Sequence, residues 1–340
     1  MICSLEVKTV TDKPLLQVKN LQTCFYTPWG VVRAVDGIDF HVDRGEVLGI
    51  VGESGSGKTV TSLSVLRLVP KPGGRIAGGE ILFKGKNLLE KSEQEMRKIR
   101  GSQVTMIPQD PMTSLNPVYR IGNQIGEPLA LHKGLKKSSL KKKVMDLLKM
   151  VHIPSPEGRM RSYPHQFSGG MKQRAIIAMC VSCQPDLIIA DEPTTALDVT
   201  IQAQILKLLK DLQSRMNTAI IFITHDLGVV ASLCSRVAVM YAGVIVEEAD
   251  VKTIFKNPIH PYTQGLIGSV PKRGKGDERL FTIEGQPPNL LNIPVGCRFE
   301  PRCFLSNERC RQEDPKTEWI SPGHRTKCFR WRESMGPSRL

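Results

Sequence analysis

Residues 52–59 read Gly-Glu-Ser-Gly-Ser-Gly-Lys-Thr and fit the pattern G-x-x-x-x-G-K-[ST] of a phosphate-binding loop. The apolar run 47–51 comes directly before this stretch, and the amphipathic run 60–68 follows it. The loop therefore joins a predicted strand to a predicted helix, which is the context that the pattern requires. Its glycines let the backbone turn its N–H groups inward, toward a phosphate. The stretch predicts a nucleoside triphosphate site.

Two side chains of such a loop have expected tasks. The Lys58 ammonium is expected to contact the β- and γ-phosphates, and the Thr59 hydroxyl to ligate Mg²⁺. The helix that begins near Gly57 adds the positive end of its dipole to the site. The residues expected to line the nucleotide are Ser54, Gly55, Ser56, Gly57, Lys58, Thr59 and Val60.

The rest of the chain up to about residue 249 alternates strand-like and helix-like stretches. Short apolar runs at 187–190 and 219–224 predict buried strands of a largely parallel sheet. Leucines and isoleucines recur at three- and four-residue spacing over 201–215, which predicts a helix between them. The pattern is typical of an α/β domain. Residues 110–166 are rich in lysine and poor in strand signals, so we expect a helical insertion there.

Polar side chains follow three of the predicted strands. Asp191 and Glu192 end the run at 187–190, His225 follows the strand 219–224, and Gln109 follows Met106-Ile-Pro. Parallel strands would bring these side chains to one edge of the sheet, beside the phosphate loop. There Asp191 would hold Mg²⁺ through water, and Glu192 would act as general base on the attacking water. His225 would bond the γ-phosphate, and Gln109 would reach Mg²⁺ or the water.

Ser168-Gly-Gly-Met-Lys-Gln-Arg174 predicts a second phosphate-binding element. Ser168 is a good N-cap residue, and Gly169 and Gly170 expose the first amide groups of a helix. Because the chain already has one phosphate loop for its own nucleotide, the second element is expected to serve a nucleotide held by another chain. This predicts a head-to-tail dimer with ATP between the subunits.

Taken together, these motifs resemble the nucleotide-binding subunits of ABC transporters. The phosphate loop, the Gln109 loop, the Ser168 signature, Asp191-Glu192, the loop 195–198 and His225 come in the order found in that family, and the resemblance covers about residues 15–330. The signature departs from the family's Leu-Ser-Gly-Gly-Gln at both ends, where this chain has Phe167 and Met171. The phosphate-contacting Ser168 and Gly170 remain.

This resemblance implies a fold, its division into domains and further nucleotide contacts. The fold is a P-loop NTPase core with a mixed, largely parallel sheet, an antiparallel β subdomain, a helical insertion and a small Cys-rich C-terminal region. The ATPase domain would span residues 1–256, with the insertion at about 110–166, and an extension would span 257–340. An aromatic residue, Phe25 or else Tyr26, would stack on adenine, and Asp198 would lie at the nucleotide interface.

Two further stretches resemble one branch of the family, the ATPases of dipeptide and oligopeptide importers. These stretches are Gln109-Asp-Pro-Met-Thr-Ser-Leu-Asn-Pro117 and Asn257-Pro-Ile-His-Pro-Tyr-Thr263. The expected function is therefore ATP hydrolysis that drives the uptake of peptides. The alternatives are import of nickel or glutathione and a non-transport role on DNA or ribosomes. A single phosphate loop and the lack of room for a long coiled coil count against the last of these.

Four of the nine cysteines cluster near the C-terminus with the spacing C-x5-C-x6-C-x17-C; they are Cys297, Cys303, Cys310 and Cys328. Four thiolates can close around zinc or around an iron–sulfur cube. Paired C-x2-4-C knuckles, which structural zinc favours, are absent from the sequence. Resemblance to the same branch implies a [4Fe–4S] cluster, with zinc as the alternative. The cluster would fasten the loop-rich tail, or act as a redox switch on the ATPase.

The chain carries a net charge of +14, and six of its lysines lie between Lys133 and Lys143. A solvated face is the first explanation of this excess, followed by proximity to a membrane. No basic stripe interleaved with aromatics predicts nucleic-acid binding. No run approaches the ~20 apolar residues of a membrane-spanning helix, and residues 1–10 do not read as a secretory signal. We expect a protein of the cytoplasmic face of the bacterial membrane, held there peripherally by its partners.

The resemblance implies those partners. They are a second ATPase subunit, identical or homologous, two integral membrane permeases and, indirectly, a substrate-binding protein.

Overall fold

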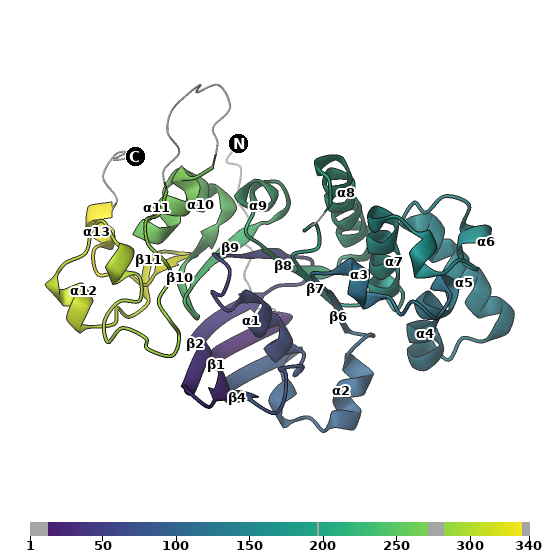
Figure 1. The fold of residues 1–340 in the computed structure, drawn as a ribbon, viewed down its shortest axis with the longest axis horizontal. Coiled ribbons are helices and arrows are strands. Elements are labelled where there is room, and N and C mark those ends of the chain that lie inside the picture. The colour runs from purple at the N-terminus through teal and green to yellow at the C-terminus, as the bar shows by residue number, and fades with distance from the viewer. Residues whose placement is uncertain (1–12, 196, 271–281, 335–340) are drawn as a thin grey trace, which may run out of the picture.

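A mixed sheet of eight strands forms the centre of the molecule (Figure 1). The computed structural model describes residues 13–195, 197–270 and 282–334. Residues 1–10, which do not read as a secretory signal, lie outside the described ranges. The strand order is β11-β12-β10-β9-β3-β8-β7-β6. The strands are β3 Val47–Val51, β6 Val104–Ile107, β7 Leu187–Asp191, β8 Ala219–Thr224, β9 Arg236–Tyr241, β10 Val244–Asp250, β11 Glu318–Ser321 and β12 His324–Thr326.

Strands β6, β7, β8, β3 and β9 are parallel to one another, whereas β10, β12 and β11 pair antiparallel. Every residue of β3, β7 and β8 is buried, as the uninterrupted apolar runs predict for strands covered on both faces. The predicted mixed, largely parallel sheet is therefore confirmed. Since the five parallel strands point the same way, their carboxyl ends lie along one edge.

A second, antiparallel sheet contains the strands β2-β1-β4-β5. Its strands are β1 Leu16–Thr27, β2 Gly30–Val42, β4 Gly74–Phe83 and β5 Lys86–Asn87. The inward face of this sheet joins the central sheet in one hydrophobic core, which includes Leu16, Val35 and Ile81 with Leu48 and Ile189. This is the antiparallel subdomain that the family resemblance implied.

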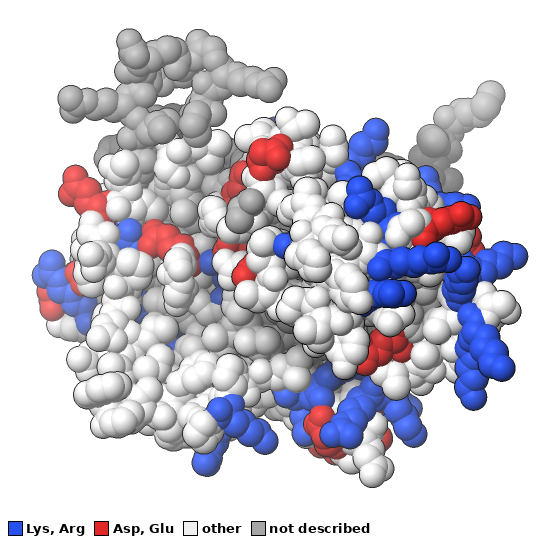
Figure 2. Space-filling model, turned by 45° about the vertical axis from the view of Figure 1, so that its right-hand side comes forward, with Lys and Arg blue, Asp and Glu red and all other residues white. Residues whose placement is uncertain are grey.

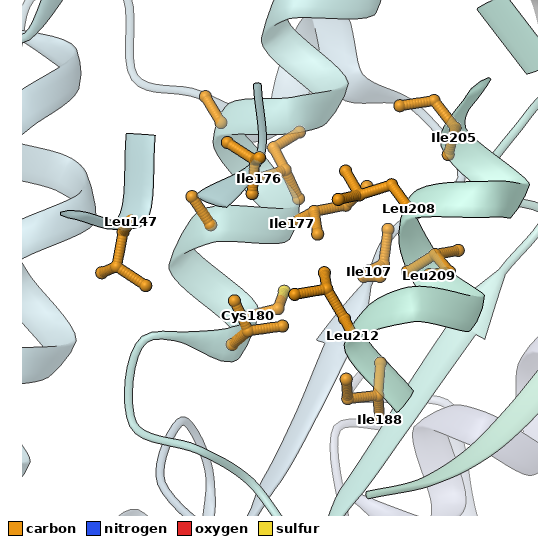
Figure 3. Close-up of a cluster of buried hydrophobic side chains, with 14 of the residues drawn as sticks. Ile107, Leu147, Ile176, Ile177, Cys180, Ile188, Ile205, Leu208, Leu209 and Leu212 are labelled. Atoms are coloured by element: carbon orange, nitrogen blue, oxygen red, sulfur yellow. The ribbon is translucent and has the colours of Figure 1, made fainter. Parts of the chain in front are cut away.

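Helices cover the other face of the central sheet. Helix α7, Gly169–Val181, and helix α8, Val199–Met216, press isoleucines and leucines onto β6 and β7, and Figure 3 shows their side chains interleaved. In α8 the buried residues are Ile205, Leu208, Leu209 and Leu212. This spacing of three and four residues confirms the helix predicted over 201–215.

Helices fill the segment predicted as a helical insertion, and Figure 1 shows those of residues 121–159 at one end of the molecule, beyond α7. They are α3 Pro111–Ser114, α4 Ile121–Lys133, α5 Lys137–Met150 and α6 Pro156–Arg159, followed by a single 3₁₀ turn at Pro164–Gln166. The remaining helices before the C-terminal segment are α1 Lys58–Val65, α2 Glu93–Ile99, α9 Leu227–Leu233 and α10 Val251–Lys256, with a 3₁₀ turn at Leu88–Glu90.

The C-terminal segment, residues 257–334 as far as they are described, packs directly against the central sheet. Its hairpin β11–β12 pairs with β10 and lengthens the sheet. Its Tyr262 and Phe299 are buried in one core with Tyr241 and Val239 of β9. The helices of this segment are α11 Pro261–Gly268, α12 Glu308–Gln312 and α13 Trp331–Ser334, with a 3₁₀ turn at Glu300–Arg302. Among the described helices, none has both the length and the apolar character needed to cross a membrane.

Candidate active site

The phosphate loop connects β3 to α1 at the carboxyl edge of the parallel strands. Gly57 is the N-cap of α1 with φ 103°, and a Cβ there would lie 2.3 Å from the Ala34 carbonyl oxygen. Only glycine fits this position without strain. Ser54 and Gly55 are exposed, whereas Ser56 is buried and its Oγ has no hydrogen-bond partner among the described residues. A phosphate oxygen would supply the partner that this hydroxyl lacks.

Lys58 is 5% exposed and lies folded back on its own loop. Its Nζ donates to the Gly52 carbonyl at 2.8 Å and to the Glu53 carbonyl at 2.9 Å. Burial lowers the pKa of this ammonium, whereas the nearby Glu192 and Asp191 carboxylates act to raise it. The cation thus bonds two loop carbonyls within the electrostatic reach of two carboxylates.

Two of the three predicted Mg²⁺ ligands, Thr59 and Asp191, are in contact, whereas Gln109 bonds Glu192. The Thr59 hydroxyl donates to the Asp191 carboxylate at 3.2 Å, although the two residues are far apart in the chain. Asp191 is 1% exposed at the end of β7, and burial raises its pKa, with the Thr59 hydrogen bond opposing that rise. A carboxylate and a hydroxyl are hard oxygen donors, which suit Mg²⁺. The pair therefore has the chemistry of a magnesium site.

Three side chains converge on Glu192. Gln109 Nε2 donates to its carboxylate at 3.2 Å, Thr195 Oγ1 donates at 3.0 Å, and His225 Nδ1 lies 3.5 Å from the other oxygen. Glu192 itself has a left-handed backbone, with φ 45°, a conformation that costs free energy and is concentrated at functional sites. Gln109, Glu192 and His225 were each expected at this edge of the sheet, and the structure places them in contact.

The signature residue Ser168 and the neighbouring Asp198 act as helix caps. Ser168 caps α7, where its Oγ accepts from the Met171 N–H at 3.4 Å, and it is exposed. Asp198 is likewise exposed and caps α8 by accepting from the Ile201 N–H at 2.9 Å. No hydrogen bond among the described residues joins either one to the phosphate loop. Gly169 and Gly170 form the first turn of α7, and an added Cβ on Gly170 would lie 2.8 Å from Ile201.

Both adenine candidates lie near the end of β1. Tyr26 is 52% exposed, and the Arg75 guanidinium lies 5.5 Å from the centre of its ring. Phe25 is half-buried beside Gly74. The choice between them stays a prediction. Val60, expected to line the nucleotide, is half-buried in α1.

Sequence reasoning missed three residues of this region. Thr195 belongs to a motif of the sequence, but its contact with Glu192 was not expected. Tyr262 and Arg302 contact the loop residue Glu53: the Glu53 N–H donates to the Tyr262 hydroxyl at 2.9 Å, and Arg302 donates to the Glu53 carboxylate at 2.9 Å. Tyr262 lies inside a motif that served only to identify the branch, and no spacing links either residue to the loop.

The four clustered cysteines line a single cavity with Phe299 and other residues of the C-terminal segment; the cysteines are Cys297, Cys303, Cys310 and Cys328. Burial raises the pKa of the Cys303 and Cys328 thiols to about 12 and that of Cys297 to about 11, which favours protonated thiols in the absence of a metal. As positioned, no group of three or more His, Cys, Asp or Glu side chains in the described chain could hold a metal ion. The predicted iron–sulfur cluster and its zinc alternative therefore receive no support from a preformed metal site.

The lysine-rich stretch lies on the helices at the far end of the molecule. Lys133, Lys136, Lys137, Lys141 and Lys142 are exposed on α4, α5 and the loop between them, while Val144, Leu147 and Leu148 of α5 face the core. Figure 2 shows basic side chains spread over this end, with a few acidic ones among them. This is the pattern of a solvated helix face.

Two family models match separate stretches of the chain. Residues 35–195 match the model described as "ABC transporter". Residues 246–310 match the model described as "Oligopeptide/dipeptide transporter, C-terminal region". The second match covers part of the segment that contacts Glu53.

Curated relatives match almost the whole chain. A probable peptide ABC transporter ATP-binding protein of Sinorhizobium fredii is 54% identical over 320 residues, which cover 94% of this chain and 96% of that protein. The oligopeptide transport ATP-binding protein OppD of Bacillus subtilis is 52% identical and is covered over 88% of its length, with 93% of this chain aligned. The dipeptide transport ATP-binding protein DppD of the same organism is 50% identical, over 93% of this chain and 94% of its own.

A solved structure with the same fold is the dimeric post-hydrolysis state of the ATP-binding cassette MJ0796 bound to ADP and Pi. It has a TM-score of 0.62 and 25% sequence identity, and it covers 69% of this chain and 98% of that one. A second is cbiO1 of Clostridium perfringens, part of the ABC transporter complex cbiONQ, with a TM-score of 0.61 and 27% identity over 73% and 93% of the two chains.

Proposed function

The chain belongs to the ATP-hydrolysing subunits of ABC transporters, in the branch with the oligopeptide/dipeptide C-terminal region, and on that premise we propose that it powers the import of peptides. The observation that carries the ATPase assignment is the convergence of Gln109, Thr195 and His225 on Glu192, beside the Thr59–Asp191 pair. The names of the curated relatives described above support peptides as the cargo.

We assign the residues of the site the following roles. Lys58, the loop amides and Ser56 bind the β- and γ-phosphates, and Thr59, Asp191 and Gln109 would hold Mg²⁺ with its waters. The ion would neutralise charge on the phosphates. Glu192 accepts a proton from the attacking water, while His225 bonds the γ-phosphate and orients the nucleophile. Catalysis then consists mainly of positioning and charge neutralisation.

We also propose that a second ATPase subunit completes each site. Ser168 is exposed and Gly169 and Gly170 are half-buried, and among the described residues no hydrogen bond joins the three to their own phosphate loop. We therefore expect them to meet a triphosphate held by a partner. The cassette MJ0796, which shares the fold, has a dimeric structure with bound nucleotide. The partner is identical to this chain or homologous to it, and Asp198, exposed near the signature, would lie at the same interface.

The remaining partners follow from transport. Two integral membrane permeases would contact the helices α3–α6, so that nucleotide-driven movement reaches the translocation path, and a substrate-binding protein would deliver the peptide. The chain would then lie on the cytoplasmic face of the membrane without entering it. We propose the division into an ATPase domain, residues 1–256, and an extension, residues 257–340, although the two share a core around Tyr262 and Phe299.

Peptide import can be tested by growth. A strain auxotrophic for one amino acid and lacking this gene should fail to grow on di- to pentapeptides that contain the amino acid, while growing on the free amino acid. The intact gene should restore growth, and a copy with Glu192→Gln should not, since ATP hydrolysis drives uptake.

The same strains separate the alternative cargoes. Normal growth of the deletion strain on every peptide, together with loss of nickel or glutathione uptake, would contradict peptide import and leave the ATPase assignment intact. Rescue by the Glu192→Gln copy would instead contradict the assignment of Glu192 as general base.

For the four clustered cysteines we propose a [4Fe–4S] cluster, with zinc as the alternative. Cys310 lies in α12 and the other three cysteines lie outside regular elements, and all four line one cavity. Four thiolates are the ligand set of such a cluster. Their spacing lacks the paired knuckles of structural zinc. When bound, the group would crosslink turns that few regular elements hold together.

The cluster proposal predicts that anaerobically purified protein is brown and contains about four irons per chain. Cys303→Ser should remove most of the colour and iron, because a hydroxyl is a poor replacement for a thiolate ligand. Cys234→Ser, which alters a cysteine that does not line the cavity, should change neither. A colourless wild type with one zinc per chain, or full iron retention by Cys303→Ser, would contradict the assignment.

A further inference from the structure

The C-terminal segment contacts the phosphate loop at Glu53. Glu53 is the second residue of the loop, and its backbone N–H and its carboxylate both bond to that segment. Its backbone N–H donates to the Tyr262 hydroxyl at 2.9 Å, and its carboxylate accepts from Arg302 Nη1, also at 2.9 Å. Tyr262 lies in α11 and Arg302 in the 3₁₀ turn 300–302. Two separate elements of the segment, a helix and a 3₁₀ turn, therefore contact one loop residue.

These two partners are themselves fixed in place. Tyr262 is fully buried, and its ring packs on Tyr241 and Phe299 with centroid distances of 4.6 and 5.4 Å. The Arg302 side chain is 6% exposed. Its remaining N–H groups donate to the Glu284 carbonyl at 3.0 Å and, at 3.3 Å, to the Ile283 carbonyl and the Tyr241 hydroxyl. A guanidinium bound on several sides has one available geometry. Its bond to Glu53 therefore fixes the position of that carboxylate.

A second connection reaches the loop through the turn between β9 and β10. Arg298 is 7% exposed, donates to the Ala242 carbonyl at 2.5 Å and pairs with Asp36. Gly243, which follows Ala242 in the chain, donates its N–H to the Ser56 carbonyl at 2.9 Å. Arg298 thus stabilises the turn whose Gly243 bonds the middle of the phosphate loop.

From these contacts we infer that Tyr262 and Arg302 are positioning residues for nucleotide binding, through which the C-terminal segment sets the shape of the phosphate loop. The inference rests on the proposed binding of ATP phosphates by residues 52–59. The Glu53 carbonyl is one of the two acceptors of the Lys58 ammonium. The position of Glu53 therefore helps to set the position of that ammonium before a nucleotide binds. The loop amides must also be aligned before the phosphate arrives if they are to bind it tightly.

The test is calorimetric titration of the full-length chain with ATP and with ADP, each with Mg²⁺. Tyr262→Phe removes one oxygen and keeps the ring, and Arg302→Met removes the charge and keeps much of the length. Each substitution is expected to lower the affinity for both nucleotides by about five- to twentyfold, which is the effect of one lost hydrogen bond to a buried group. ATP and ADP should change alike, because both place a β-phosphate on the loop. Arg302→Lys should bind more tightly than Arg302→Met.

Matched controls separate positioning from general destabilisation. Tyr119→Phe alters an exposed tyrosine, and Arg311→Met removes an exposed arginine of the same segment that pairs with Glu300 and not with the loop; both should bind as the wild type does. Wild-type affinity in folded Tyr262→Phe protein would overturn the inference, and this variant decides the matter even where Arg302→Met does not fold. Failure of the wild type itself to bind ATP would instead overturn the proposed function.

Discussion

Replacing Glu192 with glutamine is expected to lower ATP turnover by about a hundredfold or more, with little change in ATP affinity. The variant keeps the size of the side chain, so Gln109, Thr195 and His225 retain a partner of the same shape. What it loses is the ability to accept a proton from the attacking water. Asp191, Thr59 and Lys58 are left intact, and these are the groups assigned to the metal and the phosphates. Binding and turnover should therefore separate.

The measurement is steady-state ATP hydrolysis by the chain assembled with its membrane partners, beside calorimetric ATP binding by the chain alone. Glu80→Gln is a suitable control, because Glu80 is an exposed carboxylate on β4 that pairs only with Lys19 among the contacts described. It should hydrolyse ATP at the wild-type rate. Wild-type turnover by Glu192→Gln would show that another group takes the proton, and a parallel loss of ATP affinity would show that Glu192 contributes to binding.

Most of this active site could be predicted from sequence because its signals are local. The phosphate loop fits a short pattern, and Asp191 and His225 follow apolar runs that predict buried strands. In a parallel sheet the chain direction alone then places those residues at one edge, and the structure brings them there. Ser168 and Asp198 were expected at a shared interface, and their exposed positions leave that expectation to be tested.

The contacts of the C-terminal segment could not be predicted from local sequence patterns. Tyr262 lies 209 residues from Glu53, and Arg302 lies 249 residues from it. The segment consists largely of turns and short helices, so no periodicity predicts which of its side chains point inward. The strands β11 and β12 are only four and three residues long, too short for alternation to distinguish them from loop. Where the tail packs is decided by tertiary burial of Tyr262 and Phe299.

Replacing Lys58 with alanine is expected to weaken ATP binding on the order of tenfold to a hundredfold, since a charged hydrogen bond to phosphate is lost. In the structure the ammonium bonds two loop carbonyls beside the Asp191 and Glu192 carboxylates. Without it, those carbonyls lose a donor and the triphosphate meets uncompensated negative charge. Calorimetric titration with ATP and Mg²⁺ measures the loss.

Turnover in the Lys58→Ala variant should fall as well, because hydrolysis requires bound ATP. This pattern is the reverse of that for Glu192→Gln, where binding survives and hydrolysis does not. Lys86→Ala, at an exposed lysine on β5, should leave both quantities unchanged. If Lys58→Ala bound ATP with wild-type affinity, residues 52–59 would not bind the phosphates through this cation. The positioning role of Tyr262 and Arg302 would then have to act through the loop amides alone.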